Sequence, residues 1–202
     1  MPLPVRAEAP SAVAGILERM ASVDPTLESY RARVEFSVGL RSFPYVKKTV
    51  HGDTYFKRPD KMELIFEDLP AYASHFKNVF VGLGSVRDWD TKFLITLANP
   101  PQGGQGGAEL ILVPRKSSRL HDVHVLLDPQ TSLPRRMIWH YNDGQIVLET
   151  TYVHIADHYV VASQHAEAHF PMFRGWAHSQ VSQYAFNVPI DEAIFTPKKA
   201  AQ

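Results

Sequence analysis

Residues 30–40 read YRARVEFSVGL, a strict alternation of hydrophobic and polar positions that is typical of a β-strand with one buried face. Two further strand-like segments follow at residues 48–57 and 62–66, joined by the corner Lys57-Arg58-Pro59. Because the three segments are consecutive and closely spaced, they predict an antiparallel sheet. The buried face of the first strand comprises Tyr30, Ala32, Val34, Phe36, Val38 and Leu40.

Two amphipathic helices accompany this sheet. Leu69-Pro70 opens a helix that carries Tyr72, Phe76, Val79 and Phe80 on one side, and Gly82 is a suitable stop. An earlier helix follows the N-cap candidate Ser11 and ends at Asp24-Pro25. Both helices need an apolar surface on which to dock.

The second half of the chain is predicted to be a meander of strands. The expected strands are residues 93–98, 109–113, 122–128, 135–141, 145–153, 158–168 and 176–186, followed by a short turn or helix near Phe195. Asn142-Asp143-Gly144 is a strong hairpin signal. A long antiparallel sheet must twist and curl. We therefore expect a mainly β (α+β) fold, a half-open antiparallel β-barrel of about ten or eleven strands with helices covering a hydrophobic cavity. Residues 1–10 are expected to be a flexible lead-in and residues 11–202 a single domain.

Composition excludes several classes of protein. The 21 basic and 21 acidic side chains balance, so the chain lacks the basic surface of a nucleic-acid binder. There is no cysteine, which excludes disulfides, thiolate metal sites and a cysteine nucleophile. No run approaches the roughly 18 apolar residues of a membrane-spanning helix.

The sequence predicts neither a catalytic nor a metal site. No Gly-x-Ser-x-Gly motif is present, and carboxylate pairs such as Glu67-Asp68 are only sequence neighbours. The spacings of His165 with His169 and of His121 with His124 match no known zinc pattern. We therefore expect no enzyme activity, no cofactor and no metal. The glycine tract 103–107 lacks the ending of a phosphate-binding loop and is read as a mobile loop.

The chain resembles the LolA-like family, which includes periplasmic carriers of outer-membrane lipoproteins. The resemblance spans Ser11 to Phe195, and the segments that carry it follow one another in the family's order. They are residues 30–36, 52–61, 126–129 with Leu133-Pro134, 184–188 with Ile190-Asp191, and 195–197. The resemblance implies an unclosed β-barrel, a hydrophobic cavity and helices that act as a movable cover. In the lipoprotein carrier, the arginine of an Arg-Pro pair hydrogen-bonds the cover and holds it closed, and Arg58 stands at that position here.

The resemblance leads to a functional hypothesis. We expect a monomeric, non-catalytic carrier that binds acyl chains of lipoproteins or lipids and shuttles them across the periplasm between membrane-bound donor or acceptor proteins. The chain would then be the mature form without its signal peptide. The alternatives are a lipid- or lipoprotein-sensing module that signals to a protein partner and, less favoured, an enzyme on the same fold. The predicted cavity residues are Val34, Phe36, Val38, Leu40, Leu64, Phe66, Tyr72, Phe76 and Phe80.

Three expectations stay open between a functional and a purely structural interpretation. The cavity residues could instead be ordinary packed core. Arg58 could be a solvated turn residue rather than the one that closes the cover. The apolar cluster Phe170, Met172 and Phe173 could contact a membrane or partner, or simply cap the end of the barrel.

Overall fold

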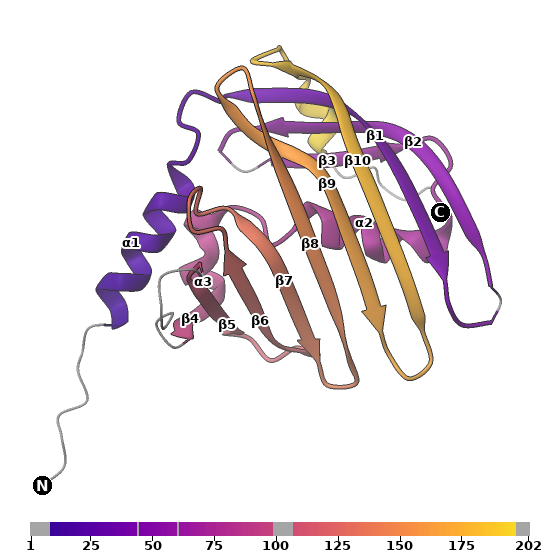
Figure 1. The fold of residues 1–202 in the computed structure, drawn as a ribbon, viewed down its shortest axis with the longest axis horizontal. Helices are drawn as coiled ribbons and strands as arrows, with labels where there is room; N and C mark the ends of the chain where they lie inside the picture. The colour runs from indigo at the N-terminus through magenta and orange to yellow at the C-terminus, as the bar shows by residue number, and fades with distance from the viewer. Residues whose placement is uncertain (1–8, 44, 60, 99–106, 197–202) are drawn as a thin grey trace, which may run out of the picture.

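The computed structural model of the chain describes residues 9–43, 45–59, 61–98 and 107–196, and it contains one large antiparallel sheet (Figure 1). The side chains of residues 9–11, 72, 74 and 75 are outside this description. The strands are β1 (Ser29–Leu40), β2 (Lys47–Lys57), β3 (Lys61–Phe66), β4 (Phe93–Ala98), β5 (Glu109–Pro114), β6 (Leu120–Leu127), β7 (Pro134–Tyr141), β8 (Gly144–Ile155), β9 (His158–His169) and β10 (Arg174–Phe186).

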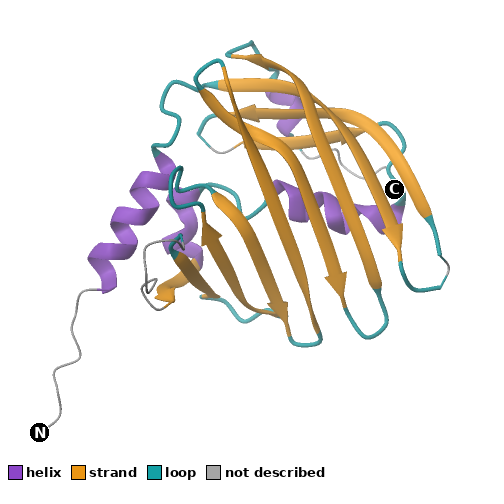
Figure 2. Ribbon diagram, in the orientation of Figure 1, coloured by secondary structure: helices purple, strands orange, loops and turns teal. Residues whose placement is uncertain are grey.

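The ten strands are ordered β3-β2-β1-β10-β9-β8-β7-β6-β5-β4. The first and last strands of the chain therefore pair in the interior of the sheet, with Val34 opposite Val181. β3 and β4 form the two edges, so the sheet curls without closing (Figures 1 and 2). The predicted half-open antiparallel barrel is confirmed.

The alternation in the first strand also holds. Val34, Phe36 and Val38 are buried on the concave side, while Arg31 and Arg33 are exposed on the convex side. A bulge in β10 shifts its register against β1 between Arg31 and Arg33. The extra residue is accommodated near Gln183, which has a positive φ of 55°.

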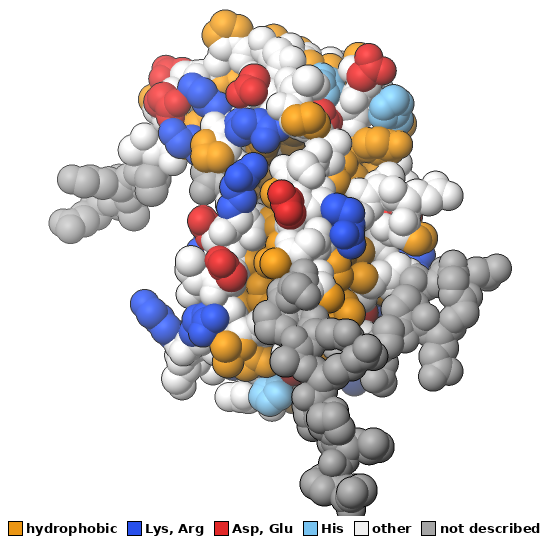
Figure 3. Space-filling view, turned by 90° about the vertical axis from the view of Figure 1, so that its left-hand side faces the viewer, with side chains coloured by type: hydrophobic (Ala, Val, Ile, Leu, Met, Phe, Trp, Pro, Cys, Tyr) orange, Lys and Arg blue, Asp and Glu red, His pale blue; other side chains and the backbone are white. Residues whose placement is uncertain are grey.

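The helices occupy one side of the sheet. α2 (Ser74–Val81), preceded by the short helix η1 (Ala71–Ala73), lies across the concave face (Figure 2). α1 (Ala9–Ala21) packs against β4 and the short helix η2 (Val86–Asp88). None of the described helices is long and apolar enough to cross a membrane. The end of the molecule that carries α1 has charged side chains of both signs interspersed with hydrophobic ones (Figure 3).

The structure differs from the sequence prediction at several element ends. α1 begins at Ala9, so Ser11 lies inside the first turn rather than capping it. α3 (Trp89–Lys92) was not predicted, because four residues are too few to show a helical period. The expected final short helix is η3 (Glu192–Phe195). Residues 103–106 of the glycine tract lie outside the described residues.

Candidate functional site

Helix α2 separates three spaces on the concave side of the sheet. Phe76 and Val79 line a large hollow toward β7–β9, Phe80 faces a small central cavity, and Val81 lines a groove toward α1. An eight-residue helix with apolar side chains on several sides cannot dock on a single flat surface. The distribution of apolar side chains around α2 thus lets the helix contact apolar surfaces on several sides and separate the three spaces.

The central cavity is nearly filled by side chains. Its volume is about 10 Å³, room for roughly one water molecule. The ring of Phe36 lies 5.1 Å from that of Phe66 and 5.2 Å from that of Phe80, measured between centroids. The hydroxyl groups of Thr54 and Ser179 are buried beside this cavity without a protein partner among the described residues. In this conformation the centre of the half-barrel is packed core.

The open space lies at one end of the half-barrel. A hollow of about 640 Å³ extends between α2, the ends of β7–β9 and the β9–β10 loop. Volumes of 300–1,000 Å³ are typical of small-molecule sites. Polar groups stand at its edge, including Asn78 and the ion pair Arg119–Asp143 at 2.9 Å. The apolar lining consists of Phe76, Val79, Trp139, Tyr141, Ile146, Ala168, Phe170, Met172 and Phe173.

The predicted cavity residues are thus divided between two places. Val34, Phe36, Leu64, Phe66 and Phe80 surround the small central cavity, and Val38 is buried in the same core. Phe76 lines the large hollow. Leu40 is only half-buried at the end of β1, and the side chain of Tyr72 lies outside the described residues. Sequence reasoning missed most of the hollow's lining from β7–β9, because alternation identifies a buried face but not where packing along it is incomplete.

The loop cluster joins this hollow. The rings of Phe76 and Phe173 lie 6.1 Å apart, and those of Tyr141 and Phe170 lie 5.6 Å apart. Met172 is 92% exposed at the tip. Phe170, Met172 and Phe173 therefore form part of the wall and rim of the hollow.

A second loop extends this rim. The β1–β2 loop is tied to the β9–β10 loop by a 2.7 Å hydrogen bond from the backbone N–H of Arg41 to the carbonyl of Arg174. It exposes Phe43 (88%) and Tyr45 (77%). The described residues 41–43, 45–48 and 170–174 contain no acidic side chain and four basic ones, Arg41, Lys47, Lys48 and Arg174. Arg41 is also ion-paired with Glu167 on β9 at 2.8 Å. We call these two segments the basic-aromatic rim.

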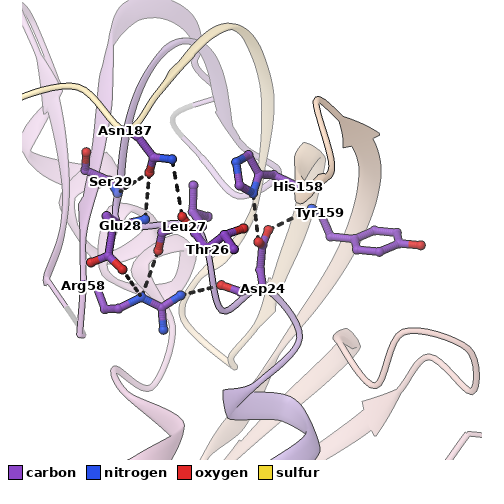
Figure 4. Close-up of polar contacts among 9 residues, drawn as sticks. All are labelled: Asp24, Thr26, Leu27, Glu28, Ser29, Arg58, His158, Tyr159 and Asn187. Carbon is purple, nitrogen blue, oxygen red and sulfur yellow. Dashed lines mark hydrogen bonds and ion pairs between the residues drawn. The ribbon is translucent and has the colours of Figure 1, made fainter.

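Arg58 lies at the other end of the half-barrel, beside a groove of about 320 Å³. Its Nε donates to the carbonyl of Leu27 at 2.9 Å, and its Nη2 donates to the carbonyl of Asp24 (Figure 4). Its guanidinium thus reaches the connector between α1 and β1, not the helix itself. The side chain is 28% exposed, and the carboxylate of Glu28 stands 3.9 Å away.

Two more residues hold this connector, and sequence reasoning identified neither. Asn187 accepts from the backbone N–H of Glu28 at 2.8 Å and donates to the carbonyl of Thr26 at 3.3 Å. His158 contacts the carboxylate of Asp24 at 2.8 Å, and the backbone N–H of Tyr159 donates to the same carboxylate at 3.2 Å (Figure 4). The only local signal was Asn187 directly after a strand, because asparagine adopts a positive φ more readily than most residues; the φ of Asn187 is 51°.

One group of side chains among the described residues has the geometry to hold a metal ion. Asp122, His124 and His140 place ligand atoms within 4.8 Å of one another on the convex side of the sheet. The sequence prediction of no metal site considered only spacing along the chain, whereas His140 reaches Asp122 across the β6–β7 pair.

Comparison with solved structures gives similar folds. A protein of the DUF1329 family from Desulfovibrio piger aligns with a TM-score of 0.69 at 14% identity, covering 93% of this chain and 97% of that one. A protein described as a putative outer membrane lipoprotein-sorting protein domain, from Vibrio parahaemolyticus, aligns with a TM-score of 0.63 at 13% identity, covering 90% and 94%. A LolA superfamily protein from Nitrosomonas europaea aligns with a TM-score of 0.58 at 10% identity, covering 91% and 97%.

The chain has the LolA-like fold. Comparison of the sequence with family models and with curated proteins finds no match. The likeness therefore lies in three-dimensional structure and extends over nearly the full length of both chains. This fold agrees with the half-open barrel predicted from residues 30–66 and the meander after them, and with the fold that the resemblance to the LolA-like family implies.

Proposed function

We propose that this protein is a non-catalytic carrier that binds acyl chains of a lipoprotein or lipid in the hollow beside α2. The observation that carries the proposal is the 640 Å³ apolar hollow on the concave side of a LolA-like half-barrel. Its lining is mostly aromatic and aliphatic, and its polar groups stand at the edge. That arrangement suits a ligand with an apolar tail and a polar head.

Transfer energies favour a carrier over a permanent binder. Burial of one long acyl chain from water is worth roughly 10 kcal/mol, at about 0.8 kcal/mol per methylene. A chain that comes from a bilayer or a lipoprotein complex leaves an apolar environment already, so its transfer into the hollow is nearly neutral. Small changes in protein contacts can then decide between loading and release.

Helix α2 is the element whose movement would enlarge the site. Its Phe76 and Val79 line the open hollow, and its Phe80 lines the small cavity in the packed centre. A shift of α2 away from the sheet would join the hollow to the side of the cavity formed by Val34, Phe36, Leu64 and Phe66. In this proposal the central residues become ligand contacts only in the loaded state, while Val38 and Leu40 continue the same strand toward the rim.

The basic-aromatic rim supports loading at a membrane. Met172 is exposed at the mouth of the hollow, and Phe43 and Tyr45 are exposed on the β1–β2 loop, which is hydrogen-bonded to Arg174 beside it. The basic side chains around them complement an anionic bilayer, where each Lys or Arg near the surface contributes about 1 kcal/mol. We propose that the rim contacts an anionic membrane, with the periplasm as the compartment and a membrane-bound donor or acceptor protein as partner.

Native mass spectrometry of the purified protein, followed by solvent extraction and lipid analysis, tests the proposal. A stoichiometric lipid adduct that disappears on extraction, and returns when the extracted protein is incubated with an acylated peptide, is the expected result. A protein that stays free of ligand after incubation with acylated peptide and phospholipid would refute it. A partner that binds only the lipid-loaded form, with no transfer of lipid, would instead indicate a sensing module.

A further inference from the structure

The convex side of the sheet carries a cluster of histidine and carboxylate side chains that the carrier function does not use. Asp122 and His124 lie two residues apart on β6 and so project to the same side. His140 on β7 is the direct cross-strand neighbour of Asp122. Their hydrophobic neighbours Val123, Val125 and Trp139 point into the core instead.

The contacts within the cluster are short. Nδ1 of His140 lies 2.5 Å from Oδ1 of Asp122, and Nε2 of His124 lies 3.6 Å from the same oxygen. The two imidazole rings are edge-to-face with centroids 4.9 Å apart. In a tetrahedral zinc site with bonds near 2.0–2.1 Å, ligand atoms stand about 3.3 Å apart. Shifts of about 1 Å in the side chains are therefore enough to place an ion among the three.

A fourth residue orients one of the histidines. Oε1 of Glu109 on β5 lies 2.9 Å from Nδ1 of His124. A carboxylate at Nδ1 keeps the proton on that nitrogen and leaves the lone pair of Nε2 available as a ligand. Nε2 is the atom that faces Asp122. His121 contacts the other carboxylate oxygen of Asp122 at 2.6 Å and orients it.

We infer that Asp122, His124 and His140 form a binding site for a divalent transition metal of the Zn²⁺ or Ni²⁺ class, with Glu109 as a positioning residue. Two imidazoles and one carboxylate suit these metals better than Ca²⁺ or Mg²⁺, which take oxygen ligands. The three ligands leave a coordination position open toward solvent. A bound ion would join β6 and β7 on the side of the sheet away from the hollow, so the inference does not rest on the proposed function.

The convex side also offers a matched control. His165 and His169 flank Glu167 on β9 at 3.4 and 3.2 Å. This second group also has two histidines and one carboxylate, but its three ligand atoms do not converge as those of Asp122, His124 and His140 do among the described residues. Variants there report on adventitious binding by surface histidines.

Calorimetric titration of the tag-free chain with ZnCl₂ and NiCl₂ tests the site. We expect saturable binding of one ion per chain, lost in His124→Gln and His140→Gln and retained in His169→Gln. Glu109→Gln should weaken binding about 10- to 100-fold, as removal of such orienting partners does. A cooperative thermal unfolding transition of each variant without metal serves as the control that the variant is folded.

A second measurement reports on the histidines directly. In a long-range ¹H–¹⁵N spectrum, Zn²⁺ should shift Nε2 of His124 while Nδ1 keeps its proton. The absence of saturable binding to the wild-type chain would overturn the inference. So would equal loss of binding in His169→Gln, because the ion would then be held by scattered surface histidines.

Discussion

The carboxylate of Asp24 lies 2.8 Å from Nδ1 of His158, and both side chains are largely buried, 13% and 8% exposed. This contact joins the connector after α1 to the turn between β8 and β9. Arg58 holds the backbone of the same connector from the β2–β3 corner, and Asn187 holds it from the end of β10. Three separate parts of the half-barrel thus hold the connector that leads from α1 into β1.

Replacing Asp24 should loosen this connector. Asp24→Asn removes the negative charge that His158 and the backbone N–H of Tyr159 both contact. Hydrogen bonds to a buried charged group contribute about 1 to 3 kcal/mol to stability. We expect the free energy of unfolding to fall by an amount in that range. Amide hydrogen exchange should also accelerate over residues 22–28.

The control for Asp24 is Asp157→Asn, the same change at an exposed position in the neighbouring turn. It should leave both measurements close to the wild-type values. If the two variants behaved alike, the contact between Asp24 and His158 would have no part in holding the connector.

Replacing Arg58 should change the rate of ligand transfer more than the equilibrium affinity for the ligand. Arg58→Leu removes two hydrogen bonds to the connector but none of the residues lining the hollow. In the proposed carrier, a looser connector lets α1 and the groove beside it open more often. We expect faster transfer of a fluorescent acyl probe to vesicles, with an equilibrium affinity changed less than the rate. Arg136→Leu, an exposed arginine on the convex side, should leave the transfer rate unchanged.

The sequence predicted the strands well because their signals are local. Alternation in β1 placed Val34, Phe36 and Val38 on the buried side, and Asn142-Asp143-Gly144 marked the turn between β7 and β8. These signals depend on side chains two residues apart and on turn geometry, which a single segment contains.

The location of the open space was not predictable in the same way. Phe36 and Phe76 carry identical hydrophobic signals, yet Phe36 is packed against Phe66 and Phe80 while Phe76 borders the hollow. The difference depends on where α2 crosses the sheet and on the summed volume of side chains from many strands. The cluster of Asp122 with His140 was hidden for a related reason, because it requires the register of β6 on β7.

Stability at high pH should depend on a group of buried tyrosines. Burial raises the pKa of Tyr30 to about 12 from its ordinary value of 10.0. It also raises the pKa values of Tyr152 and Tyr184. The unfolded chain therefore loses the Tyr30 proton near pH 10, while the folded chain keeps it to about pH 12. The stability contributed by neutral Tyr30 is complete below pH 10 and is lost as the pH rises from 10 to 12.

For Tyr30 this loss amounts to about 2 to 3 kcal/mol, at 1.36 kcal/mol for each unit of pKa difference. The free energy of unfolding of Tyr30→Phe should therefore fall less between pH 10 and pH 12 than that of the wild-type chain. Denaturant titrations at each pH measure this difference. An unchanged slope would mean that Tyr30 ionises equally in the folded and unfolded chains.

Filling the hollow should block an acyl ligand. Asn78 is exposed on α2 and lines the hollow, so a larger side chain there can occupy the space without entering the packed core. Asn78→Trp should lower the affinity for an acylated peptide about tenfold or more, a loss of about 1.4 kcal/mol in binding free energy. Asn78→Ala removes the same amide but leaves the space open, and it should bind as the wild type does. Equal binding by the two variants would place the ligand outside this hollow.

The basic-aromatic rim predicts selective binding to anionic membranes. The triple variant with Phe43→Ser, Tyr45→Ser and Met172→Ser removes three exposed apolar side chains and no charge. Exposed side chains contribute little to folding, so its thermal stability should stay near that of the wild type. Its cosedimentation with vesicles containing phosphatidylglycerol should fall at least tenfold.

The opposite end of the sheet provides the control for the rim. Ile155→Ser and Tyr159→Ser change exposed apolar residues near the β8–β9 turn, and they should not reduce vesicle binding. Binding of the wild type should weaken with added salt, because the attraction of Lys47, Lys48 and Arg174 to anionic headgroups is screened over about 10 Å at 0.1 M ionic strength. Vesicle binding that is insensitive to both salt and the triple variant would place the membrane contact elsewhere on the molecule.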